Sequence, residues 1–182
     1  MSYLDNCYPS CTAPTMLVFV TSEVYKGDLG GLVGADAKCQ SLAKKAGVVG
    51  TFKAWLGSSE VPAITRLYHS PGRYKRLDGV VVADNFERLR NGPMHATVSI
   101  TETKQNGVDA FWSGEGGFSD ADDGYCDDWT SSSWDDLGSI TPTYDPGYGY
   151  HPNGQAWTNC YSSSMALLCV QQAWYPEDPT PN

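Results

Sequence analysis

Hydrophobic and polar positions recur along this chain with two different spacings, and the longer spacing predicts a helix around Cys39. Apolar residues separated by three or four positions are typical of one face of an amphipathic helix, and here they are Ala35, Cys39, Leu42, Ala43 and Ala46. Asp36 falls in the first turn, and Gly47 falls just after the last apolar position, where glycine often ends a helix. We therefore expect a short helix that begins near Gly34 and places Cys39 against a core.

The two-residue spacing predicts the strands. It occurs over residues 15–21 and 52–56, and an apolar run over 165–170 is typical of a core strand. A further short strand is expected over 77–82. The pair Asn106-Gly107 is a strong hairpin signal, so a two-stranded ribbon is expected between Thr97 and Trp112.

A second helix is expected after residue 83. Asp84 and Glu87 have the spacing of a capping residue and its partner at a helix start. Gly92-Pro93 would end the helix.

The composition changes sharply between Ser113 and Trp157. This segment is rich in Gly, Asp, Ser, Tyr and Pro and has hardly any aliphatic residues. Such a segment cannot bury enough apolar surface to form its own core, so we expect a long loop region held at its base.

The length and composition indicate one domain. The chain has 182 residues, of which 41% are hydrophobic, enough for one substantial core. We expect an irregular lead-in over 1–14, one domain over 15–173, and a Pro-rich tail or linker over 174–182. No apolar run reaches the roughly 18 residues of a membrane helix, so membrane insertion is not expected.

The net charge of -9, from 12 basic and 21 acidic residues, disfavours nucleic acid, heparin-like polyanions and anionic membranes as partners. A local basic patch is the alternative. Basic residues lie close together in two parts of the sequence: Arg66, Arg73, Lys75 and Arg76, and Arg88 with Arg90.

Six cysteines without a Cys-x-x-Cys pair favour disulfides over a metal cluster, and disulfides indicate an oxidising compartment. The six residues are Cys7, Cys11, Cys39, Cys126, Cys160 and Cys169. Spacing alone leaves all of their connectivities open.

Three stretches together resemble the endostatin-like domains, which belong to the C-type lectin-like superfamily and occur in certain collagens and bacterial surface proteins. They are residues 34–59, the Trp112-Ser113-Gly114 and Tyr125-Cys126-Asp127-Asp128-Trp129 elements, and the apolar strand between Cys160 and Cys169. The resemblance implies an α+β, C-type lectin-like fold with two helices, small antiparallel sheets and a long disulfide-held loop region.

The resemblance also implies a disulfide pairing. It joins Cys39 to Cys169 and Cys126 to Cys160, which leaves Cys7 and Cys11 to close a small N-terminal loop. Three tryptophans lie in matched elements and are expected to be buried: Trp55, Trp112 and Trp129.

The chain departs from the family at its metal and polyanion sites. No histidine-rich N-terminus occurs, and an acidic segment over 119–124 replaces the expected arginines, so neither zinc nor heparin binding is expected. The Glu-Pro-Asn and Gln-Pro-Asp triplets of sugar-binding C-type lectins are also missing.

An acidic loop supplies the candidate metal ligands. Seven aspartates lie between residues 120 and 136, and calcium binds six to eight oxygen atoms in flexible geometry. The expected ligands are Asp120, Asp122, Asp123 and Asp127. The alternative is a solvated acidic loop that binds no metal.

A second loop supplies the candidate contacts to a ligand. Aromatic rings and hydroxyls on a glycine-rich loop suit stacking on, and hydrogen bonding to, a sugar or a protein surface. These residues are Tyr144, Tyr148, Tyr150 and His151. The alternative is that they pack the loop down onto the protein.

No nucleophile elbow, zinc-protease helix or phosphate-binding loop occurs, so we do not expect an enzyme. We expect an extracellular or cell-surface adhesion module of a bacterial protein. Its partner would be a glycan or a host extracellular protein, bound through the long loop region with or without calcium. The alternative is a protein-binding or structural assembly module that binds no sugar.

Overall fold

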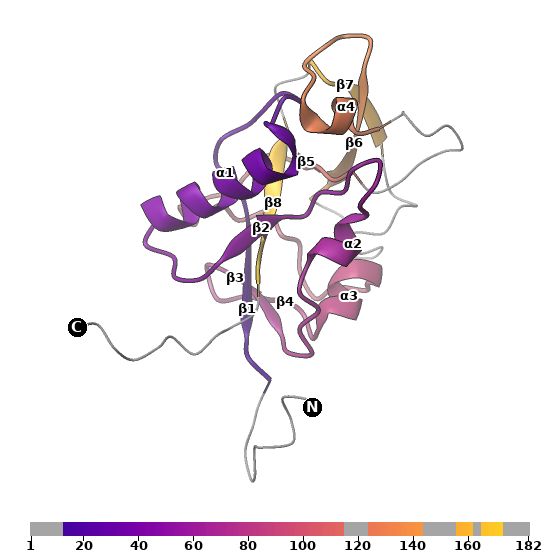
Figure 1. The fold of residues 1–182 in the computed structure, drawn as a ribbon. Helices are drawn as coiled ribbons and strands as arrows, with labels where there is room; N and C mark the ends of the chain where they lie inside the picture. Colours follow the sequence, from indigo (N-terminus) through magenta and orange to yellow (C-terminus); the bar gives the residue numbers. More distant parts are fainter. Residues whose placement is uncertain (1–12, 115–123, 144–155, 162–164, 173–182) are drawn as a thin grey trace, which may run out of the picture.

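A computed structural model describes residues 13–114, 124–143, 156–161 and 165–172, and these form an α+β fold (Figure 1). The strands are β1 Met16–Val20, β2 Phe52–Ala54, β3 Tyr74–Arg76, β4 Val81–Ala83, β5 Ala110–Trp112, β6 Leu137–Pro142, β7 Ala156–Asn159 and β8 Ala166–Gln171. The helices are α1 Gly31–Lys45, α2 Ala63–Arg66, α3 Phe86–Asn91 and α4 Cys126–Trp129. None of these helices is both long enough and apolar enough to cross a membrane.

β8 lies at the centre of a mixed eight-stranded sheet with the order β4-β3-β1-β8-β5-β6-β7, in which β2 also pairs with β8. β1 pairs antiparallel with β8. The second edge of β8 is shared by two strands. β5 pairs in parallel with residues 166–167, and β2 pairs antiparallel with residues 169–171. The small antiparallel sheets expected from the resemblance are thus replaced by one sheet with two parallel pairs, β1 with β3 and β5 with β8.

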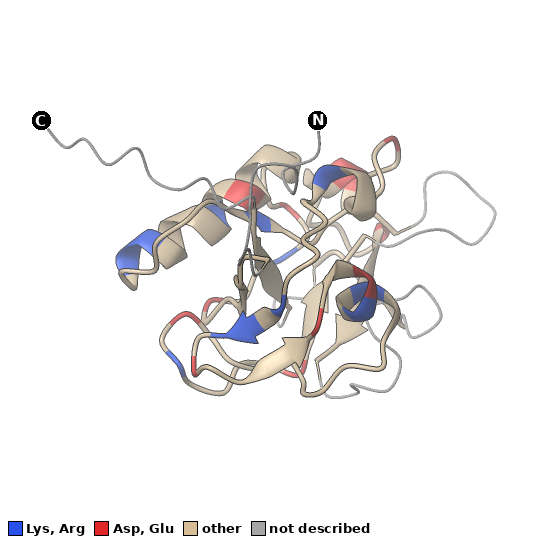
Figure 2. Cartoon of the chain, turned by 90° about the horizontal axis from the view of Figure 1, so that it is seen from below, with Lys and Arg blue, Asp and Glu red and all other residues tan. Residues whose placement is uncertain are grey.

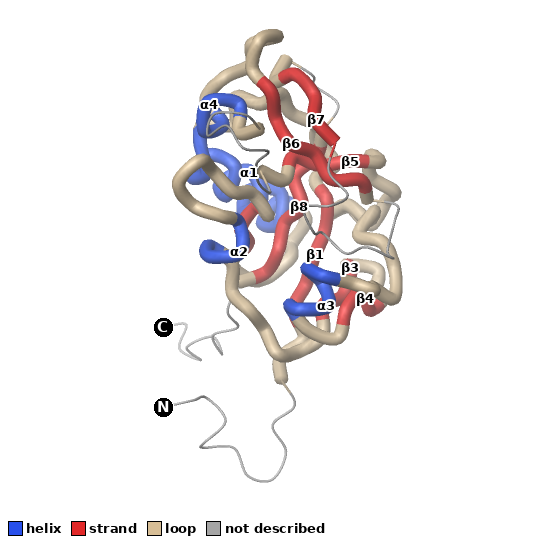
Figure 3. Tube along the Cα trace, turned by 90° about the vertical axis from the view of Figure 1, so that its right-hand side faces the viewer, coloured by secondary structure: helices blue, strands red, loops and turns tan. Residues whose placement is uncertain are grey.

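All six residues of β8 are buried, and alternate residues face two different cores. Ala166, Leu168 and Val170 pack with the first core, which contains Trp55 and Phe111. Leu167 and Cys169 pack with the second core, which contains Cys39 and Trp112. In Figure 3, α1, α2 and α4 lie on one side of the strands and α3 lies apart from them.

The helix around Cys39 was predicted correctly in type but begins earlier than expected. α1 begins at Gly31, after Gly30 with φ 78°, so Asp36 lies in the second turn and not in the first. Asp36 instead accepts a hydrogen bond from Ala54 N at 2.9 Å and pairs with Arg66 at 2.7 Å. It therefore ties α1 to β2 and α2. Gly47 follows the helix with φ 69°, as expected, while Ala46 is exposed.

Both predicted disulfides within the described residues are confirmed. Cys39 on α1 is bonded to Cys169 on β8, and Cys126 on α4 is bonded to Cys160 after β7. Cys7 and Cys11 lie outside the described residues. The three tryptophans expected to be buried, Trp55, Trp112 and Trp129, each expose 0% of their surface.

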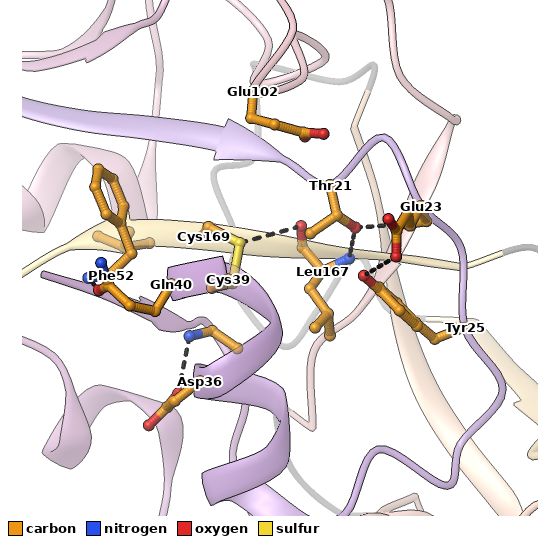
Figure 4. Close-up of a disulfide and its surroundings, with 12 residues drawn as sticks. Thr21, Glu23, Tyr25, Asp36, Cys39, Gln40, Phe52, Glu102, Leu167 and Cys169 are labelled. Carbon is orange, nitrogen blue, oxygen red and sulfur yellow. Dashed lines mark hydrogen bonds between the residues drawn. A yellow bond between two sulfur atoms is a disulfide. The ribbon is translucent and has the colours of Figure 1, made fainter. Parts of the chain in front are cut away.

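Polar side chains beside the Cys39–Cys169 disulfide are paired with the backbone, as Figure 4 shows. Thr21 Oγ1 accepts a hydrogen bond from Leu167 N at 2.9 Å and donates to Glu23 O at 2.7 Å. Tyr25 donates to the Glu23 carboxylate, and burial, together with the negative charge of Glu23, raises the pKa of Tyr25. These contacts fix the chain where it leaves β1.

The second helix is confirmed as α3, but its cap is Asn85 and not Asp84. Asn85 Oδ1 accepts a hydrogen bond from Arg88 N at 2.9 Å. Asp84 instead binds His95 at 2.9 Å, and this hydrogen bond lowers the pKa of Asp84.

Three expectations for the strands were wrong. Residues 77–80 form the turn between β3 and β4, so 77–82 is not one strand. The ribbon around Asn106-Gly107 is reduced to a single bridge between Ile100 and Asn106. The turn lies at 101–105, where Lys104 has φ 62°, and β5 pairs with β6 and β8. The segment 113–157 is not all loop, because it contains α4, β6 and the start of β7.

The arginines close together in the sequence do not form one free basic patch. Arg66 pairs with Asp36, Arg73 with Asp84, and Arg76 with Asp78. Figure 2 shows basic segments dispersed over several elements and interspersed with acidic ones.

The two disulfides should differ in their contribution to stability. Cys39 and Cys169 are 130 positions apart, against 34 for Cys126 and Cys160. On the chain-entropy model, these loops correspond to about 5 and about 4 kcal/mol. We expect Cys39→Ala/Cys169→Ala to lower the free energy of unfolding more than Cys126→Ala/Cys160→Ala does, as measured by urea denaturation. An equal or reversed loss would contradict this ordering.

Candidate functional site

α4 is a single left-handed turn. Its φ angles are 50° at Cys126, 52° at Asp127, 50° at Asp128 and 67° at Trp129. Trp129 N donates to Tyr125 O at 2.7 Å, and Thr130 N donates to Cys126 O at 3.1 Å. Left-handed backbone costs about 1–2 kcal/mol per non-glycine residue. The surrounding structure must therefore hold this turn in place.

Two buried side chains at the ends of the turn supply that support. Cys126 is bonded to Cys160, and the buried Trp129 donates from Nε1 to Gly57 O at 2.6 Å. The Trp129 ring also meets Trp112 edge-on, with ring centres 5.8 Å apart. With both ends buried, Asp127 and Asp128 in the middle are exposed.

The exposed side of the turn forms one wall of an acidic hollow of about 310 Å³. Four carboxylates line it, and no Lys, Arg or His is among its lining residues. The lining residues are Ser59, Tyr125, Asp127, Asp128, Asp135, Asp136 and Leu137. The hollow thus presents hydrogen-bond acceptors and negative charge.

Nearby hydroxyls hold three of these carboxylates. Ser59 donates to Asp128 from N at 2.8 Å and from Oγ at 2.9 Å. Thr130 Oγ1 lies 3.3 Å from Asp127 Oδ2, and Ser131 Oγ donates to Asp136. Asp135 is exposed, so its carboxylate faces the solvent.

A stacked aromatic pair includes Trp134, which directly precedes the lining residue Asp135 in the sequence. Trp134 and Tyr161 are 65% and 43% exposed, and their ring centres lie 4.7 Å apart with an angle of 21° between the planes. The Nζ atom of Lys26 lies 3.6 Å from the centre of the Tyr161 ring. Such a cation over a ring is attracted by its electrons.

The end of the β6–β7 hairpin brings Trp134 and Tyr161 together. Leu137 on β6 pairs with Asn159 on β7, so the residues before β6 and after β7 meet at one end. Cys160 N donates to Asp136 O at 2.9 Å, and Gly27 N donates to Cys160 O at 2.8 Å. A Cβ atom at Gly27 would lie 2.3 Å from Cys126 Sγ, so only glycine allows this approach. This close approach of Gly27 to Cys126 and Cys160 places the neighbouring Lys26 over the Tyr161 ring.

Most of the candidate residues from the sequence lie outside the part of the chain that the structure describes. Of the four expected calcium ligands, Asp127 lies in the hollow, and Asp120, Asp122 and Asp123 lie outside the described residues. The expected ligand contacts, Tyr144, Tyr148, Tyr150 and His151, also lie outside the described residues. Within the described ranges, no three His, Cys, Asp or Glu side chains are grouped as metal ligands would be.

The sequence reasoning missed Trp134, Tyr161, Lys26 and Ser59. One local signal marks Trp134: it lies in the run Ser131-Ser132-Ser133-Trp134-Asp135-Asp136, where every neighbour is polar. A tryptophan that belongs to no apolar repeat has no core face to join, which predicts an exposed ring. The partners of Trp134 come from distant parts of the chain, and only the fold shows them.

No family model matches the chain, and no curated protein sequence matches it.

The strain at α4 can be tested with glycine. Asp127→Gly should raise the free energy of unfolding by about 0.5–1 kcal/mol, because the relief of left-handed backbone exceeds the entropic cost of glycine. Asp135 is not among the residues with positive φ, so Asp135→Gly should lower the same quantity by about 0.5–1 kcal/mol. Urea denaturation measures both, and a loss in both variants would refute the assignment of strain.

Proposed function

We propose that this chain is an extracellular binding module that recognises a glycan on the surface formed by Trp134, Tyr161 and the acidic hollow. The observation that carries the proposal is the exposed, stacked aromatic pair, in which Trp134 is directly followed by Asp135 and Asp136 of the acidic hollow. The C–H face of a sugar ring packs on an aromatic ring, and sugar hydroxyls donate to carboxylates.

The exposure of Trp134 supports a binding role on energetic grounds. A tryptophan side chain buries 150–250 Å² in round terms when it packs, and a free protein gains nothing from leaving 65% of it in water. Exposed tryptophan and tyrosine are enriched among residues that dominate binding energy. The alternative is a protein-binding or structural assembly module without sugar binding, which would use the same aromatic surface.

The scaffold supports an extracellular location and the likeness to endostatin-like domains. Buried disulfides are typical of proteins from oxidising compartments. The two disulfides within the described residues have the pairing that the resemblance implies, and Trp55, Trp112 and Trp129 are buried. On this basis, we propose a C-type lectin-like fold and a role in adhesion at a bacterial surface or after secretion.

Calcium is the second element of the proposal. Seven carboxylates lie between Asp120 and Asp136, and four of the residues that line the hollow belong to this group. Calcium accepts such oxygen ligands in flexible geometry, whereas magnesium demands a tight octahedron. Asp127 is the expected ligand within the described residues.

Binding to immobilised ligands separates the glycan proposal from its alternative. We expect the protein to bind members of a glycan array, and to bind deglycosylated extracellular matrix proteins much more weakly. Binding to the deglycosylated proteins with no binding to the array would favour the alternative function and refute glycan recognition.

Thermal unfolding tests calcium. Ligand that binds only the folded protein stabilises it by about 2.7 kcal/mol at a hundredfold excess over Kd. Millimolar calcium should therefore raise the Tm by several degrees, magnesium should raise it much less, and Asp127→Asn should reduce the shift. Asp109→Asn changes an exposed carboxylate outside the lining of the hollow and serves as the matched control. An unchanged Tm would show that the acidic loop is solvated surface.

A further inference from the structure

Both faces of the Tyr161 ring are occupied within the protein. The Trp134 ring stacks on it with ring centres 4.7 Å apart, and the Lys26 ammonium lies 3.6 Å from its centre. A stacked ring at that distance leaves no room for an ammonium group over the same face. Trp134 and Lys26 must therefore lie on opposite faces, and neither face of Tyr161 is left for a ligand.

Trp134, in contrast to Tyr161, is largely exposed to solvent. Tyr161 covers one face of its indole, and 65% of the residue remains exposed. The outer face of Trp134 is thus the flat apolar surface that this pair presents to solvent. Tyr161 and Lys26 lie behind it, and they hold the indole in place through stacking and a cation–π contact.

The charges around the indole limit which sugars can approach. Asp135 and Asp136 directly follow Trp134, and Asp127 and Asp128 line the same hollow. Lys26, the base in contact with the aromatic pair, is separated from the outer face of Trp134 by the Tyr161 ring. A sugar that carries a carboxylate or a sulfate would meet like charges here, whereas neutral hydroxyls would meet hydrogen-bond acceptors.

We infer that the outer face of the Trp134 indole binds a hexopyranose that carries no acidic group, and that the neighbouring carboxylates reject sialylated and sulfated forms of the same glycan. This inference rests on the proposed function, and it specifies the residue in contact and the chemical class of the ligand.

The test uses pairs of glycans that differ by a single acidic group. Neutral N-acetyllactosamine and its sulfated and sialylated forms are immobilised, and the intact protein is titrated over each. Wild type should bind the neutral form about tenfold or more tightly than either acidic form. This preference should shrink as salt is raised from 0.02 M toward roughly 0.5 M, because salt screens exposed charges.

Three variants assign the preference to residues. Trp134→Ala should weaken binding to the neutral glycan about tenfold or more, as expected for a central aromatic contact. Tyr68→Ala removes another exposed aromatic, one that does not line the hollow, and should leave binding unchanged. Asp135→Asn should improve binding to the sulfated form several-fold relative to binding of the neutral form. Because Trp134 and Asp135 are exposed, these variants should keep the wild-type Tm.

The outcomes distinguish a failure of the inference about Trp134 from a failure of the proposed function. If the neutral glycan binds Trp134→Ala as tightly as wild type, or if wild type prefers the acidic forms, the inference is wrong while glycan recognition stands. If wild type binds no glycan on the array, the proposed function fails and the inference fails with it.

Discussion

The structure depends on β8, a strand whose two edges and two faces are all occupied. β1 takes one edge, and β5 and β2 divide the other between them. Because buried backbone groups must find hydrogen-bond partners, a fully buried strand with an unpaired edge would be strongly unfavourable. Successive side chains along β8 point alternately into the two cores. The bond from Cys169 to Cys39 fixes the longest helix on one of these faces.

The proposed binding surface is an extension of this framework through β5, β6 and β7. The β6–β7 hairpin carries Trp134 and Asp135 before its first strand and Tyr161 after its second. The bond from Cys160 to Cys126 and the buried Trp129 ring hold the left-handed turn beside them. Local strain in the backbone is tolerated because these covalent and packing contacts outweigh it. The exposed groups are thus positioned before any ligand arrives, which lowers the entropic cost of binding.

The sequence pattern predicted those elements that are determined by the spacing of their own residues. The spacing around Cys39 predicted α1, and the apolar run before Cys169 predicted β8. Prediction was wrong where a distant partner decides the outcome. Asp36 looked like a first-turn residue, but it binds Arg66 and Ala54. Asn106-Gly107 favours a hairpin, but β5 pairs with β6 on one edge and with β8 on the other, and a two-stranded ribbon would pair only one edge. The stack of Trp134 on Tyr161 joins residues that only the hairpin brings together, so no local pattern could predict it.

The position of β8 in the sequence has a consequence for biosynthesis. β1, β2 and β5 are all translated before the strand that they share, so the edges that pair with β8 have no partner until β8 has been added. Folding through such distant contacts is slow, since a long loop must close before the contacts form. A chain that stays unfolded until then can be threaded through a translocation pore while it is still being completed. Under the proposed extracellular location, oxidation of Cys39 with Cys169 follows export, and the bond then fixes α1 covalently to the finished sheet.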